Sequence, residues 1–185
     1  MKDIIRNNIL SMVTVIAVTM FFSCKNNFKE VQKIGISENE PIGVAEQINL
    51  KYTDSGKIKA ILLSPKMLDY SNRKEFSFSE FPNGINLTLF DEENQKSTVV
   101  ADYAIVYNKT DLMDLQGHVV IATKDNDTLH AEQLFYDQKK EWLFTNKPVT
   151  FRTGLDLING NGFDSDTKFT NAEVLEINGI ITVNE

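Results

Sequence analysis

The sequence predicts an all-β domain assembled from repeated pairs of antiparallel strands. Apolar residues alternate with polar ones over short runs, turn-forming residues separate the runs, and one phrase recurs about every 30 residues. From about Ile48 onward, no window carries the ~3.6-residue apolar stripe of an amphipathic helix. We therefore expect each repeat to add two strands to stacked layers, which bury their apolar faces against their neighbours.

Residues 1–23 have the pattern of a lipoprotein signal peptide. Lys2 and Arg6 precede an apolar run of about 14 residues, which is shorter than the ~20 residues that cross a bilayer as a helix. The run ends in FFSC, which resembles a bacterial lipobox although phenylalanines replace the usual leucine and small residue. We predict that Cys24 is acylated and becomes the mature N-terminus. The alternative is an uncleaved anchor helix, and either anchor tethers the chain to a membrane.

Residues 24–46 mix charged residues, Asn and Gly without a sustained period, which predicts a linker before a single domain over residues 47–185. Without residues 1–23, the chain has 17 basic and 25 acidic residues and a net charge of −8. This charge disfavours binding to nucleic acid. Because Cys24 is the only cysteine, no disulfide can form within the domain, and its stability must come from a hydrophobic core.

Two hairpins are predicted by turn residues between alternating runs. Residues 48–64, INLKYTDSGKIKAILLS, place the turn at Asp54, Ser55 and Gly56. Residues 84–102, GINLTLFDEENQKSTVVAD, place a second turn in their charged centre.

A repeated phrase predicts which residues share one side of the sheets. Tyr70, Tyr107 and Tyr136 are each followed, six and eight residues later, by large apolar residues. Residues 113–121 and 175–183 also share a template of alternating apolar residues around a central glycine. Equivalent positions should face one side and line the space between sheets, although ordinary core packing or chance similarity are alternatives. The six residues are Phe76, Phe78, Met113, Leu115, Trp142 and Phe144.

The last strand expected, residues 175–183, is apolar on one face and lacks proline and lysine. Such an edge exposes unpaired backbone groups, so we predict that it pairs with a strand of another protein. The alternative is a frayed end without a partner. The apolar residues of this edge are Leu175, Ile177, Ile181 and Val183.

The remaining polar residues predict neither an enzyme nor a cofactor or metal site. His118 and His130 lie in strand-like runs without the spacing of metal ligands, and residues 164–166 lack a complete calcium-loop pattern. No glycine-rich phosphate loop or nucleophile elbow occurs. Residues 127–129 resemble an O-glycosylation acceptor triplet centred on Thr128, a motif too short to decide.

Several of these phrases together resemble the lipopolysaccharide-export C-component family (LptC), in the lipoprotein form of Bacteroidetes-type bacteria. The most specific are ADYAIVYNKTDLMDLQGHVVI and LHAEQLFYDQKKEWLFTNKPVTF, and the resemblance extends from about residue 24 to 183. It implies a twisted, V-shaped β-jellyroll at the periplasmic face of the inner membrane, anchored here through Cys24. Better-known members use a transmembrane helix instead, so contacts made by that helix are not implied.

The resemblance also implies partners. The jellyroll would accept lipopolysaccharide from an inner-membrane ABC transporter and pass it to the next jellyroll of a periplasmic bridge, with acyl chains against some of the six repeat residues. The edge near residues 48–52 would then face the transporter, and the C-terminal edge the next jellyroll. Two alternatives remain: a sister jellyroll acting elsewhere, or a β-scaffold lipoprotein that binds a protein or glycan and carries no lipid.

Overall fold

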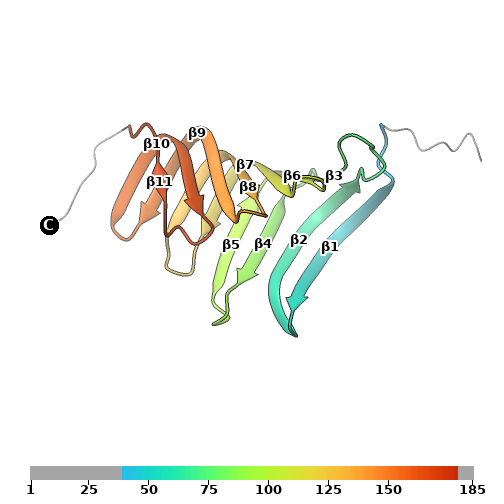
Figure 1. The fold of residues 1–185 in the computed structure, drawn as a ribbon, viewed down its shortest axis with the longest axis horizontal. Helices are drawn as coiled ribbons and strands as arrows, with labels where there is room; N and C mark the ends of the chain where they lie inside the picture. Colours follow the sequence, from blue (N-terminus) through green and yellow to red (C-terminus); the bar gives the residue numbers. More distant parts are fainter. Residues whose placement is uncertain (1–38, 179–185) are drawn as a thin grey trace, which may run out of the picture. The chain divides into compact units, whose positions relative to one another are not determined.

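The computed structural model describes residues 39–178, and in this range the chain is an all-β domain (Figure 1). The strands, all of which pair antiparallel, are β1 (Gly43–Asp54), β2 (Lys57–Asp69), β3 (Phe78–Phe81), β4 (Ile85–Phe90), β5 (Lys96–Ala101), β6 (Tyr103–Tyr107), β7 (Leu112–Ala122), β8 (Thr128–Asp137), β9 (Trp142–Thr153), β10 (Asp156–Asp166) and β11 (Glu173–Val174). No helix among the described residues is long and apolar enough to cross a membrane.

The strands form one sheet that divides into two arms. β2 pairs with β4 through residues 60–63 and with β3 through residues 68–69. β7 likewise pairs with β5 through residues 120–122 and with β6 through residues 112–116. We call the part that contains β4 and β5 the first arm and the part that contains β3 and β6 the second arm. The long strands β1, β2, β7, β8, β9 and β10 run through both arms, as a jellyroll requires (Figure 1).

Irregular backbone marks the bend where the strands pass from one arm to the other. The pairing of β7 with β8 shifts between Gln116 and Val119, and the β8–β9 and β9–β10 pairings shift at the same level of the sheet. Gly117 has φ +71° at this point, and a Cβ there would lie 3.0 Å from the side chain of Asp102. Gly84, with φ +82°, would place a Cβ only 2.5 Å from the carbonyl oxygen of Ala101. Bulges bend strands in this way, and glycine supplies the backbone conformation.

The two arms bury their facing sides against each other. In β7, Leu115 faces inward in the second arm and Val119 and Ile121 in the first, with exposed fractions of 1–3%. Val119 is four positions after Leu115, an even number, so the inward alternation continues across the bend although the β7–β8 pairing shifts there. The largest fully buried apolar side chains are Leu115, Val119, Leu129, Leu134 and Phe163. Burying each of these contributes about 1.5–3 kcal/mol, which makes the inner face the main source of stability.

Both predicted hairpins are confirmed. β1 and β2 meet at Ser55 and Gly56, which have φ +50° and +78°, and β4 pairs with β5 across the charged turn. β1 starts at Gly43, four residues before the expected domain start, because residues 43–46 pair with residues 66–69. β1 pairs only with β2, and most of its side chains are exposed, so the alternation that marks buried strands is weak there. The predicted signal peptide and Cys24 lie outside the described residues.

Candidate functional site

The space between the two arms is the candidate site, and its lining is almost entirely apolar. Both arms contribute to one narrow cavity of about 30 Å³. Its walls are formed by Leu87, Leu89, Ser97, Val99 and Ile121 of the first arm, by Met113, Leu115, Tyr136 and Leu143 of the second arm, and by Thr167. We call this space the inner groove.

The polar groups of the inner groove are few. Burial raises the pKa of the Tyr136 hydroxyl, which therefore stays neutral and uncharged at physiological pH. The hydroxyl of Ser165 is fully buried on the inner face of β10 and has no hydrogen-bond partner in the structure. Among the described residues, no group of three or more His, Cys, Asp or Glu side chains is placed to hold a metal ion. This lining is suited to apolar chains and not to charged or reactive substrates.

The inner groove is closed most tightly toward β9 and β10. Phe151 of the first arm lies 5.4 Å, between ring centroids, from Phe163 of the second arm. Phe169, in the loop after β10, completes this cluster. Toward β1 and β2, the side chains that pack against the core, such as Ile48 and Leu62, are only partly buried. The packing of the groove therefore loosens from its C-terminal end to its N-terminal end.

The structure brings only two of the six expected lining residues into the inner groove. Met113 and Leu115 line the cavity. Trp142 lies on the opposite face, where its indole N–H donates to Asp164, and Phe144 on the same face is 37% exposed. The remaining two lie elsewhere: Phe78 stacks on Tyr70, and Phe76 lies outside the strands with 69% exposure.

The expectation for Trp142 and Phe144 is wrong because Tyr107 and Tyr136 do not mark equivalent positions. In the β6–β7 hairpin the turn ends at Asp111, and in the β8–β9 hairpin it ends at Glu141, with φ +53° and +51° respectively. Aligning these turns makes Met113 equivalent to Leu143, not to Trp142. A slip of one residue moves every side chain of a strand to the other face. The residue with positive φ before each strand sets the register, and comparison of the sequences did not reveal it.

Within residues 39–178, both ends of the sheet are strand edges to which no further strand pairs. At the C-terminal end, the backbone N–H of Leu175 donates to the Gly162 carbonyl at 3.0 Å, and that of Asn178 to the Asn159 carbonyl at 2.9 Å. Residues 173–178 thus follow β10, with Leu175 39% and Ile177 50% exposed. Ile181 and Val183 lie outside the described residues. At the other end, β2 is the one described strand that pairs with β1.

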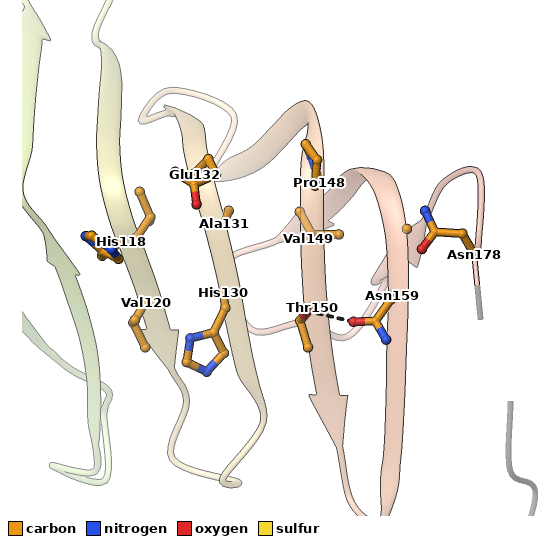
Figure 2. A pocket seen from close by; sticks show the side chains of 12 residues that line it. His118, Val120, His130, Ala131, Glu132, Pro148, Val149, Thr150, Asn159 and Asn178 are labelled. Carbon is orange, nitrogen blue, oxygen red and sulfur yellow. Dashed lines mark hydrogen bonds between the residues drawn. The ribbon is translucent and has the colours of Figure 1, made fainter. Parts of the chain in front are cut away.

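The outer face of the sheet carries a second hollow, of about 500 Å³, on β7 to β10 (Figure 2). Its lining mixes apolar and polar residues. Among the polar ones, Thr150 donates to the Asn159 side chain at 2.7 Å, and His118, His130 and Glu132 also line the hollow. The His118 ring meets the Asp102 carboxylate at 2.6 Å, which raises the pKa of His118. Both histidines are exposed on the outer face of their strands.

The fold and the groove together define a β-jellyroll with an apolar interior and, in the part of the chain that the structure describes, an unpaired strand edge at each end. The sequence matches the family described as lipopolysaccharide-assembly, LptC-related, over residues 10–181. The chain therefore belongs to this family, whose members are periplasmic, are associated with the inner membrane and act in lipopolysaccharide transport. A comparison with curated proteins gives no match to an individual protein.

Proposed function

We propose that the protein is a membrane-anchored component of the lipopolysaccharide export bridge. It accepts lipopolysaccharide from an inner-membrane ABC transporter and passes it to the next jellyroll protein in the periplasm. The observation that supports this function is the inner groove, which is lined by apolar side chains from both arms. In this proposal, Cys24 carries the lipid anchor at the periplasmic face of the inner membrane.

The groove would serve transport by keeping acyl chains out of water. Exposure of apolar chain costs about 0.8 kcal/mol per CH₂, so one acyl chain of about 12 carbons costs on the order of 10 kcal/mol in water. A groove that repeats the same apolar lining from strand to strand removes this cost along the whole path. No acid, base or metal is needed for that step.

The open edges would supply the continuity of the path. The β1 edge faces the transporter in this proposal, and residues 175–178 with the following chain pair with the next jellyroll. Strand pairing would join the inner faces of successive proteins because side chains keep their alternation across a continuous sheet. The exposed apolar side chains on these edges, such as Val44 and Ile177, are suited to such contacts.

Photo-crosslinking in living cells tests the proposal with a matched pair of neighbours. A photoreactive residue at Leu143, which faces the inner groove, should capture lipopolysaccharide, and so should one at Met113. The same residue at Phe144, which is adjacent in sequence but faces outward, should capture none or far less. Equal capture at Leu143 and Phe144, or capture at Phe144 alone, would show that lipid does not use the inner groove.

A further inference from the structure

The loop of residues 167–172, which joins β10 to β11, lies across the opening between the two arms. We call it the closing loop. Its first residue, Thr167, donates its backbone N–H to the carbonyl of Glu141 at 3.2 Å, in the β8–β9 turn at the end of the second arm. Thr167 and Lys168 also line a pocket together with the turns at the end of the first arm, residues 91–93 and 123–125. The loop thus extends from the end of one arm to the ends of strands in the other.

Phe169 inserts from this loop between the arms. Its ring lies 5.3 Å from that of Phe151 in the first arm and 5.5 Å from that of Phe163 in the second, nearly perpendicular to both. Phe169 is 8% exposed, and Thr167 beside it lines the inner groove. The closing loop therefore contributes both the cover of the groove and the aromatic side chain that fills its C-terminal end.

The closing loop holds its shape largely through its own hydrogen bonds. The carboxylate of Asp166 accepts the backbone N–H groups of Lys168 and Thr170, at 3.0 and 2.9 Å, and the side-chain amide of Asn171 at 2.9 Å. These bonds fix the loop to Asp166, the last residue of β10, so movement of the loop must pivot at Asp166 or break them. Phe169 itself has φ +58°, a conformation that bulky residues rarely adopt and that the surrounding contacts must hold.

In this structure the inner groove has no room for an acyl chain. Its cavity of about 30 Å³ is far below the roughly 300–1,000 Å³ of a typical ligand site. Ser165 lies on β10, the strand that leads into the loop. Its buried hydroxyl has no hydrogen-bond partner, so the closed arrangement leaves one buried polar group unpaired.

We propose that the closing loop is a lid, with Phe169 as its wedge, and that it must leave the opening between the arms before an acyl chain occupies the C-terminal half of the inner groove. This inference rests on the proposed lipid transport. It assigns to residues 167–172 a gating role at the end from which lipid would pass to the next protein. Lipid transfer through this end would then depend on movement of the loop.

A reversible disulfide tests the lid. Glu141→Cys combined with Thr167→Cys joins two residues whose backbones are hydrogen-bonded, with the Thr167 nitrogen 3.2 Å from the Glu141 carbonyl oxygen. With the photoreactive residue at Met113, the oxidised full-length protein should capture at least tenfold less lipopolysaccharide in cells than the same protein after reduction. The single variants Glu141→Cys and Thr167→Cys should not respond to oxidant. A mass-shift assay on the purified protein reports how much disulfide has formed.

The outcomes separate the lid from the transport function. Equal capture by the oxidised and reduced forms would overturn the lid and leave the transport proposal standing. No capture in the reduced form or in the protein without added cysteines would overturn both. Phe169→Ala provides a second variant, which keeps the loop but removes the wedge. Capture at Met113 should rise in this variant, and unchanged or lower capture in a variant that still unfolds cooperatively would also overturn the lid.

Discussion

Asp102 and His118 illustrate how single residues stabilise the bend between the arms. Asp102 follows β5, and His118 lies in the bulge of β7 with φ +42°. Their side chains meet at 2.6 Å, and the neighbouring Glu132 also favours the charged imidazole. The pair thus connects β7 to the junction of β5 and β6 on the outer face.

We predict that this pair makes stability depend on pH. Because the pKa of His118 is raised above its ordinary value of 6.5, protonated His118 is favoured in the folded state. Its contribution is complete below about pH 6.5 and is lost as the pH rises through the raised pKa of the folded protein. The melting temperature should therefore fall over that range, by a small amount because both side chains are exposed.

His118→Asn is the matched variant, since asparagine tolerates the positive φ at this position. Thermal melts of the two proteins from about pH 6 to pH 8.5 measure the difference. The difference in melting temperature between wild type and variant should shrink as the pH rises. A difference that stays constant over the range would show that the ion pair does not contribute.

At the scale of elements, Gly160 determines how the C-terminal segment lies on β10. A Cβ at this position would come 2.4 Å from the carbonyl oxygen of Leu175 and 2.5 Å from the side chain of Val174. The segment can therefore lie against β10 only because residue 160 has no side chain. This close approach explains why residue 160 of the GNG sequence is a glycine. The second glycine, Gly162, is required because its φ is +120°, which other residues rarely adopt.

We predict that Gly160→Ala displaces residues 174–178 from β10 and costs about 1–3 kcal/mol of stability. Faster hydrogen exchange at the amides of Leu175 and Asn178 would report the displacement, because both are bonded to β10. If this segment is the edge that pairs with the next jellyroll, co-purification of that protein should fall as well. Gly43→Ala on the opposite edge is the control, since its Cβ would meet only Asp69 at an ordinary 3.6 Å. Unchanged exchange in Gly160→Ala would contradict the prediction.

For the whole molecule, the proposed anchor determines where the jellyroll works. Cys24 is the only cysteine and follows the apolar run, so we predict that Cys24→Ala abolishes acylation. Metabolic labelling with a fatty-acid analogue measures it, and membrane fractionation reports whether the protein is released. If the variant incorporated as much fatty-acid label as the wild-type protein, lipidation at Cys24 would be ruled out.

The local pattern of the sequence was sufficient to predict that the strands exist. It was not sufficient to predict which side chains of each strand point to the interior. Alternation in residues 48–64 and 84–102 was sufficient to predict two hairpins, because a strand with one buried face must alternate. The same reasoning assigned Trp142 and Phe144 to the interior and was wrong. Their register depends on the backbone of the preceding turn, where Glu141 has a positive φ that its residue type does not predict.

The sequence by itself determined the all-β class, the hairpins, the net negative charge and membership of the LptC-related family. Each of these depends on composition, on period-two alternation or on motifs that are local in the chain. Only the tertiary structure decided which residues face the inner groove, where the strands bend, and that Phe169 closes the opening between the arms. Those features arise from contacts between residues far apart in sequence, such as Phe151 and Phe169. The local pattern of a sequence does not predict such contacts.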